Sequence, residues 1–264
     1  MPKKISKKAS PKETSRKRVT AIKKTVKNKK DEPKSWNLLS KVKAGISKVF
    51  GKKDKTLPKR LAPTKASKSG NEKTLDMCLV LDCTGSMYTW IQRSKDTLKD
   101  IIDQVKNDNP TLKVRVAFVG YRDFGDGAQQ YSTIDFTDDL NKVKAFISKQ
   151  NATGGSDFPE DVQGGFHKAL GMSWDPQSIK SVFHIADAPG HGKEMCDYGD
   201  RYPNGSPDGH KLQDQMKLFS GFGMHFTFVK VNESCNKMIK LMKDNYNPSG
   251  LTLNVTDLAH ACAT

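Results

Sequence analysis

The chain has 264 residues, 35% of them hydrophobic, and a formal net charge of +16. The charge is unevenly placed: residues 1–73 carry 25 Lys and Arg against 5 Asp and Glu, whereas residues 74–264 carry 20 against 24. No apolar run reaches the roughly 20 residues that span a bilayer, and the N-terminus lacks the apolar segment of a signal peptide. Membrane insertion and secretion by ordinary signals are therefore not expected.

The five cysteines include no C-x-x-C pair and are odd in number. This pattern favours neither a disulfide framework nor a thiolate zinc site, and it is typical of reduced thiols inside a cell. We expect a cytoplasmic protein. The basic N-terminal region makes nuclear import an alternative.

The chain is predicted to contain a disordered basic tail (1–35), a basic amphipathic helix (36–50), a linker (51–73) and one globular domain (74–264). The tail has almost no large apolar side chains whose burial would offset the entropy of ordering it. Its clustered cations could contact a nucleic acid or an anionic membrane surface. These cations are Lys3, Lys4, Lys7, Lys8, Arg16, Lys17 and Arg18.

The globular part alternates β-prone apolar runs with helical patterns. Strands are predicted at 75–82, 114–121, 131–136, 179–186, 224–231 and 251–255, and helices at 86–106, 140–149, 159–170, 210–219 and 235–243. The short run at 131–136 is predicted as an edge strand. This order indicates an α/β fold, a doubly wound Rossmann-like sheet that is mostly parallel, with one short antiparallel edge strand and helices on both faces.

The segment LVLDCTGSM joins the first strand to the first helix. Asp82, Thr84 and Ser86 alternate in sequence after the strand, so their oxygens can converge on one cation such as Mg²⁺ or Ca²⁺. The alternative is that Asp82 and Ser86 cap the helix that starts near Tyr88. These nine residues alone do not separate the two interpretations.

Two further acidic loops are predicted at the same sheet edge. ATGGSDFPED, before the helix at 159–170, contains Asp157 and Glu160, and the strand FHIA ends at Asp187. Right-handed crossovers bring the carboxyl ends of parallel strands together. Oxygen ligands without thiolate or a required imidazole select Mg²⁺, Mn²⁺ or Ca²⁺. The joint occurrence of the three loops favours the metal site.

With these motifs the domain resembles a von Willebrand factor type A domain carrying a metal-ion-dependent adhesion site. The family's D-x-S-x-S motif corresponds to Asp82, Thr84 and Ser86, and its last ligand to Asp187. The D-x-P-E form of the second loop makes Glu160 the favoured ligand there, with Asp157 second and Thr153 third. The resemblance implies Mg²⁺, with Mn²⁺ or Ca²⁺ as alternatives.

The runs DCTGSM, VRVAFVGYRDF, ATGGSDFPEDVQGGF, DAPGHGK and RYPNGSPDG are similar to the A-domains that accompany α-type protein kinases. This closer similarity covers about residues 74–257. No room is expected for a kinase domain, so kinase activity does not transfer. Asp187 is followed by Ala-Pro-Gly-His instead of the D-G-x-x-x-D run of many adhesive members.

The resemblance implies a non-enzymatic module in which an Asp or Glu carboxylate of a protein partner completes the shell of the bound metal. Surface residues around that position would set specificity. The residues predicted for this rim are Tyr88, Trp90, Tyr121, Arg122 and His191, together with the loop at 188–209. Nothing in the sequence indicates the oligomeric state.

Two other functions are kept as alternatives. A metal-dependent hydrolase could use Asp82, Asp157 and Asp187, but no nucleophile or general base is evident. A nucleic-acid-binding protein could act mainly through residues 1–73. A zinc site assembled from His184, His191, Cys196 and His210 matches no familiar spacing, and His184 is better interpreted as a core histidine.

Overall fold

A computed structural model of the chain describes residues 73–246, 251 and 253–258. The predicted basic tail, the predicted amphipathic helix and all but the last residue of the predicted linker lie outside the described residues. None of the described helices is both long enough and apolar enough to cross a bilayer.

The described part of the chain is built on one six-stranded sheet with the order β3-β2-β1-β4-β5-β6. The strands are β1 (Thr74–Asp82), β2 (Lys113–Tyr121), β3 (Tyr131–Thr137), β4 (Ile179–Ala186), β5 (His225–Lys230) and β6 (Leu253–Asp257). Neighbouring strands are parallel except that β3, at one edge, is antiparallel to β2. This confirms the predicted fold class.

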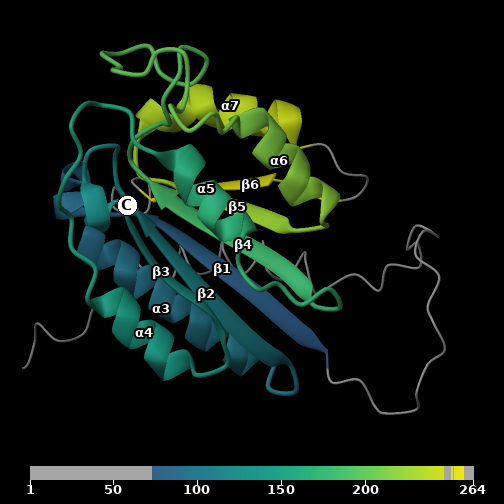
Figure 1. The fold of residues 1–264 in the computed structure, drawn as a ribbon. Coiled ribbons are helices and arrows are strands. Elements are labelled where there is room, and N and C mark those ends of the chain that lie inside the picture. Colours follow the sequence, from purple (N-terminus) through teal and green to yellow (C-terminus); the bar gives the residue numbers. More distant parts are fainter. Residues whose placement is uncertain (1–72, 247–250, 252, 259–264) are drawn as a thin grey trace, which may run out of the picture. The chain divides into compact units, whose positions relative to one another are not determined.

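Helices cover both faces of the sheet (Figure 1). Helices α3 (Ile91–Asp108) and α4 (Leu140–Ser148) lie on one face. Helices α5 (Val162–Leu170), α6 (Leu212–Gly221) and α7 (Asn236–Asn245) lie on the other. Three short 3-10 helices at Gly85–Thr89, Gly127–Gln129 and Glu233–Cys235 complete the described elements.

Strand β1 is buried on both faces because it lies in the middle of this sheet. Met77 and Leu79 pack into the core beneath α3 and α4. Cys78 and Val80 pack into the core beneath α5, α6 and α7. Side chains of a strand point alternately to its two faces, so a strand covered on both sides needs an almost continuous apolar run.

The carboxyl ends of the central strands meet at one edge of the sheet. Asp82 is paired in register with Tyr121 at the end of β2, and Leu81 with Ile185 near the end of β4. Strand order reverses here, since β2 and β4 flank β1 on opposite sides. The loops that follow these strands therefore converge where α/β sheets bind ligands.

The prediction that α5 begins at Pro159 is wrong. The helix begins at Val162, and the Asp161 side chain caps it by accepting a hydrogen bond from the Gly164 N–H. The reason is that Glu160 forms an isolated β-bridge with Gly190, which holds it in extended backbone.

The first helix of the domain is divided into a 3-10 turn at Gly85–Thr89 and α3, which starts at Ile91. Neither segment has a side-chain cap. The interpretation of Asp82 and Ser86 as helix caps is therefore wrong. The boundaries of α6, α7 and β6 each differ from the predicted ones by one to two residues.

Buried polar side chains of the core have partners that the sequence pattern does not show. His184 is fully buried in β4 and its Nε2 lies 2.8 Å from the Tyr121 hydroxyl. Burial lowers the pKa of His184 to about 3, so the ring is neutral. This confirms the prediction of a core histidine.

Among the described cysteines, Cys78, Cys83, Cys196 and Cys235 are all free and buried.

Candidate metal centre

The loop after β1 carries three oxygen-bearing side chains that are linked to one another. The Oδ1 atom of Asp82 accepts hydrogen bonds from the Thr84 N–H at 2.9 Å and from the Thr84 hydroxyl at 2.6 Å. The Thr84 hydroxyl also lies 3.2 Å from the Ser86 hydroxyl. The tight turn thus holds a carboxylate and two hydroxyl groups on one side of the loop.

The end of β4 joins this group through Ser86. The Ser86 hydroxyl donates a hydrogen bond of 2.9 Å to Oδ1 of Asp187. Asp187 is itself held in place, because the Ser234 hydroxyl donates to its backbone carbonyl. Residues 101 positions apart in sequence are therefore in contact at the sheet edge, as the order of the strands predicts.

Glu160 supplies the third carboxylate. Its N–H donates to the Pro189 carbonyl at 2.9 Å, which joins the second loop to the loop after β4. A Cβ atom on Gly155 would lie 2.9 Å from Oε1 of Glu160 and 3.5 Å from Cβ of Thr84. Glu160 and Thr84 thus border the same small space, into which only a glycine at position 155 fits.

The three carboxyl groups are buried together. Burial, followed by the charge of Asp187, raises the pKa of Asp82 to about 7. Burial, followed by the charges of Asp82 and Asp123, raises the pKa of Glu160 to about 10. Burial also raises the pKa of Asp187, against the lowering effect of the Ser86 hydrogen bond. The site therefore brings three carboxyl groups together in a position where water cannot stabilise their charged forms.

Two carboxylate oxygens of this group have no hydrogen-bond partner. Oδ2 of Asp82 and Oε2 of Glu160 are both buried and unpaired. None of the ion pairs formed by the described residues involves Asp82, Glu160 or Asp187. Buried carboxylates of this kind are stabilised by a cation or by protons. Carboxylate and hydroxyl oxygens without nitrogen or sulfur fit Mg²⁺, Mn²⁺ or Ca²⁺.

Arg122, a cation whose charge acts on Asp82, is engaged by other groups. Arg122 is buried, and its guanidinium group donates to the backbone carbonyls of Thr153, Gln129 and Asn151 at 2.8–3.0 Å. Its positive charge lowers the pKa of Asp82. This effect is smaller than the increase caused by burial and by the charge of Asp187. The Thr153 hydroxyl also accepts from Arg122, so Thr153 is engaged away from the carboxylates.

Asp157, the second candidate in the D-x-P-E loop, lies in a different group. Its Oδ2 atom accepts from the Arg201 N–H at 2.7 Å, and its carboxylate clusters with Asp123 and His191. The pKa of Asp157 is raised by burial and then by Asp123, whereas that of Glu160 is raised by burial and then by both Asp82 and Asp123. The structure therefore places Glu160, and not Asp157, beside the first loop.

Three of the five predicted rim residues are buried, and their assignment to the rim is wrong. Tyr121 has no exposed surface because its ring packs in the core and its hydroxyl contacts His184. Arg122 is held by the backbone carbonyls described above. His191 is also without exposed surface and lies between the carboxylates of Asp123 and Asp200.

The exposed aromatic residues at this edge are partly different from those predicted. Tyr88 is 78% exposed, as a rim residue requires, whereas Trp90 is half-buried and packs against the core. Phe158, which the prediction omitted, and Tyr198, which belongs to the predicted rim loop at 188–209, are exposed and form an edge-to-face pair at 5.5 Å. Phe158 lies inside the D-x-P-E loop, and an aromatic residue within a ligand loop is the signal that could have identified it.

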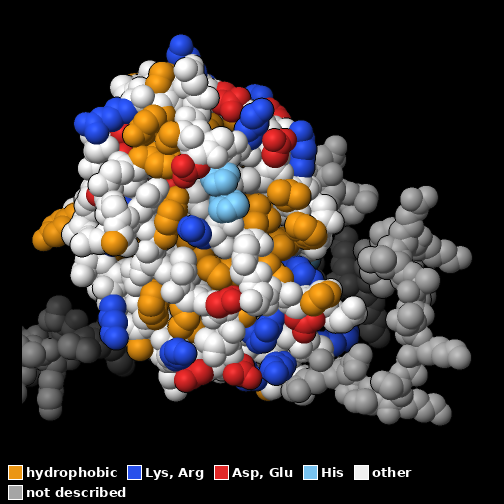
Figure 2. Space-filling model, viewed as in Figure 1, with side chains coloured by type: hydrophobic (Ala, Val, Ile, Leu, Met, Phe, Trp, Pro, Cys, Tyr) orange, Lys and Arg blue, Asp and Glu red, His pale blue; other side chains and the backbone are white. Residues whose placement is uncertain are grey.

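Acidic and basic side chains are interspersed over the face of the molecule that Figure 2 shows, among several hydrophobic groups. That face therefore gives no reason to expect a field of a single sign.

Sequence comparisons give relatives for part of the chain. The family model described as von Willebrand factor A domain matches residues 76–198. The alpha-protein kinase vwkA of Dictyostelium discoideum is 35% identical over 158 residues, which are 60% of this chain and 25% of the kinase. A putative ariadne-like RING finger protein of Acanthamoeba polyphaga mimivirus is 27% identical over 123 residues, 47% of this chain and 12% of that protein. The chain thus matches a quarter or less of each relative's length.

Solved structures share the fold at low sequence identity. The pilus adhesin SpaC from Lactobacillus rhamnosus GG, in its open conformation, aligns with a TM-score of 0.51 and 16% identity, over 75% of this chain and 29% of the adhesin. A second crystal structure of the same adhesin gives a TM-score of 0.52 and 15% identity, over 75% of this chain and 30% of the adhesin. At such identities the likeness concerns the fold alone.

Proposed function

We propose that the chain is a protein-interaction module of the von Willebrand factor A kind and that it binds its partner through a divalent metal ion. The proposed metal ligands are Asp82, Thr84, Ser86, Glu160 and Asp187, directly or through water. The observation that carries this proposal is the pair of buried, unpaired oxygens on Asp82 and Glu160.

The residues of the loops have separate tasks in this proposal. Thr84 fixes the Asp82 carboxylate through Oδ1, which leaves Oδ2 free toward the metal position. Ser86 orients Asp187 in the same way. The bound cation would supply a Lewis-acidic position for an Asp or Glu carboxylate of a protein partner. Hydroxyl and carboxylate oxygens favour Mg²⁺, with Mn²⁺ or Ca²⁺ as alternatives.

A metal-dependent hydrolase is the second candidate function, and the arrangement of Asp157 bears on it. That mechanism was based on Asp82, Asp157 and Asp187 around one metal, whereas Asp157 clusters with Asp123 and His191. The geometry therefore favours the interaction module. Phosphate release from a generic phosphoester that is lost in Asp187→Ala would support the hydrolase instead.

The N-terminal proposals rest on the sequence alone, because residues 1–72 lie outside the described part of the chain. We retain the hypothesis that the basic tail contacts a nucleic acid or an anionic membrane surface. Such contacts must weaken with salt. The cytoplasmic location and the nuclear alternative likewise stay predictions.

Titration of the full chain with Mg²⁺ and Mn²⁺ tests the metal proposal. We expect wild type to bind one equivalent of metal at the carboxylate group. Asp82→Ala should bind the metal more than about 100-fold more weakly, because loss of a direct ligand should lower the affinity at least as much as loss of a residue that supports a ligand. Calorimetry measures the affinity. Asp187→Asn, which keeps the hydrogen bond from Ser86, serves as a second variant with the same expected direction.

The control for this titration is Asp96→Ala, since the Asp96 side chain is 52% exposed on α3 and pairs with Lys99. Its metal affinity should equal that of wild type. If neither metal binds or stabilises wild type, or if Asp82→Ala and Asp96→Ala bind alike, the ligand assignment is wrong.

Gly155→Ala tests the shape of the site from the second loop. Gly155 has a φ of +83°, and an added Cβ would press on Oε1 of Glu160 at 2.9 Å. We expect metal affinity to fall by about 10-fold or more. Gly125→Ala is the matched control, because Gly125 has a φ of +100° but no atom within 4 Å of its added Cβ. Both variants carry backbone strain of about 1 kcal/mol, so only a loss confined to Gly155→Ala supports the site.

A further inference from the structure

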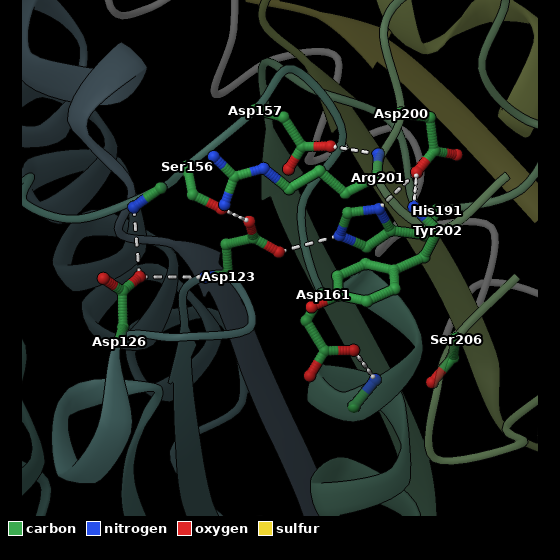
Figure 3. A network of polar contacts seen from close by, with 12 residues as sticks. Asp123, Asp126, Ser156, Asp157, Asp161, His191, Asp200, Arg201, Tyr202 and Ser206 are labelled. Carbon is green, nitrogen blue, oxygen red and sulfur yellow. Dashed lines mark hydrogen bonds and ion pairs between the residues drawn. The ribbon is translucent and has the colours of Figure 1, made fainter.

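We propose that Asp123, Asp157 and His191 form a second cation site, which takes a transition-metal dication of the Zn²⁺ class. One ligand atom of each residue lies within 4.8 Å of the other two. Among the residues that the structure describes, no other three His, Cys, Asp or Glu side chains are arranged so closely. The three side chains come from the loop after β2, the D-x-P-E loop and the loop after β4 (Figure 3).

The histidine is held as metal-binding histidines usually are. Nδ1 of His191 lies 2.8 Å from Oδ1 of Asp200, and Nε2 points to the other side of the ring, toward Asp123 (Figure 3). A carboxylate on the far ring nitrogen fixes the tautomer and the ring orientation of a ligating histidine. Asp200 is fixed in turn by the N–H groups of Gly192 and Tyr202, both at 2.7 Å.

The two carboxylates are also oriented by their neighbours. Oδ2 of Asp123 accepts from the Ser156 hydroxyl at 2.7 Å, which leaves Oδ1 directed to His191. Oδ2 of Asp157 accepts from the Arg201 N–H, and its Oδ1 is buried without any partner. The unpaired Oδ1 atom of Asp157 is an independent sign that the cluster has room for a further ligand such as a metal ion.

The ligand set and spacing fit zinc better than magnesium. Imidazole nitrogen and carboxylate oxygen are both ligand types that Zn²⁺ takes, whereas Mg²⁺ prefers oxygen alone. Four-coordinate zinc with bonds of ~2.1 Å separates its ligand atoms by roughly 3.4 Å. Oδ1 of Asp123 lies 2.7 Å from Nε2 of His191, and the third atom lies within 4.8 Å, so only small side-chain shifts are required.

This second site uses none of the ligands proposed for the first. Glu160 is influenced by both groups, since its pKa is raised by burial and then by the charges of Asp82 and Asp123. The inference is independent of the proposed function, because a zinc ion here is held by other side chains and needs no partner carboxylate. The two proposals can therefore fail separately.

Zinc titration of the full chain in the presence of excess Mg²⁺ tests the inference. Calorimetry gives the stoichiometry and affinity, and NMR of the histidine ring nitrogens shows whether His191 is a ligand. We expect one zinc equivalent in wild type, with a shift of the His191 Nε2 resonance. Asp157→Asn should bind zinc at least about 10-fold more weakly. It should fold normally, because the Asn oxygen can still accept the Arg201 N–H.

Three further variants make the result specific. His191→Gln should lose the zinc equivalent like Asp157→Asn. Asp197→Asn, in the same loop but exposed and paired with Lys237, should bind as wild type does. Asp82→Ala should also retain the zinc equivalent while losing the Mg²⁺ site. Zinc affinity that is equal in wild type and Asp157→Asn, as binding to a cysteine thiol would give, overturns the proposal. So does a His191 ring that keeps protons on both nitrogens at saturating zinc.

Discussion

Asp76→Ala is expected to lower the free energy of unfolding by about 3–5 kcal/mol, because it leaves a charged partner without its counterion. Asp76 is fully buried in β1. Its two oxygens accept from Nε of Arg115 at 2.8 Å and from Nη2 at 2.6 Å, and Oδ2 also accepts from the Asp175 N–H at 2.7 Å. Such bidentate pairs are among the strongest in proteins.

Urea unfolding followed by circular dichroism measures this loss. Asp138→Ala is the control, since Asp138 forms a longer, exposed pair with Lys113 at 3.7 Å and should cost at most about 1 kcal/mol. Asp76 precedes Asp82 by six residues of extended strand, or ~20 Å. Metal affinity should therefore be unchanged in Asp76→Ala. An equal loss of stability in the two variants would show that the Asp76 pair is no stronger than a surface pair.

The sheet could be predicted from sequence because its central strands are buried on both faces. The run from Leu75 to Leu81 has no alternation of polar and apolar residues, which separates it from an amphipathic strand. The edge position of β3 agrees with the partial burial of its residues, although β3 is longer than β5 and β6. Helix boundaries were less accurate, because a bridge between distant residues decides where α5 begins.

The first and last loops of the metal site were predictable because they directly follow strands whose ends must meet. Asp82 and Asp187 need only the order of the strands to be brought together. The ligand in the second loop was not predictable, since Asp157 and Glu160 are three residues apart and either side chain could have pointed toward Asp82. The contact of Glu160 with the Pro189 carbonyl settles its position, and no local pattern encodes that contact.

The predicted rim failed for a physical reason as well. Polar and aromatic residues after a strand can face solvent or satisfy buried groups, and sequence does not distinguish the two. Arg122 is used to satisfy three backbone carbonyls, and His191 bridges two carboxylates. Asp123, which follows β2 at the same edge, is the residue that the same strand-end argument should have added.

The metal-free protein is expected to lose stability as the pH rises from about 5 to about 9. The pKa of Asp82 is raised by burial and Asp187 to about 7, and that of Glu160 by burial and Asp82 to about 10. Both values exceed those of the unfolded chain, which are about 4. The folded protein therefore holds more protons, and the stability that they contribute below about pH 4 is lost as the pH rises through 7 toward 10.

Each pKa unit corresponds to about 1.4 kcal/mol, so Asp82 alone makes the metal-free protein less stable by a few kcal/mol at pH 9 than at pH 4. Mg²⁺ replaces the protons, and its stabilising effect should consequently be larger at pH 8.5 than at pH 5.5. Melting temperatures measured at both values, with Mg²⁺ or with EDTA, test this. The pKa of His191 is also raised: burial lowers it, but the hydrogen bonds to Asp123 and Asp200 outweigh burial. His191 therefore adds a pH dependence of the same sign.

Asp82→Asn separates the contribution of the metal centre from that of His191. This variant has no titrating group at position 82 and keeps an oxygen to accept the Thr84 bonds, so its melting temperature without metal should fall less steeply with pH. It should also gain little from Mg²⁺ at either pH. Equal slopes for wild type and Asp82→Asn would mean that the Asp82 carboxyl group is already ionised and compensated in the metal-free fold. The unpaired Oδ2 atom of Asp82 would then no longer support a bound cation, because no uncompensated buried charge would remain for a metal ion to stabilise.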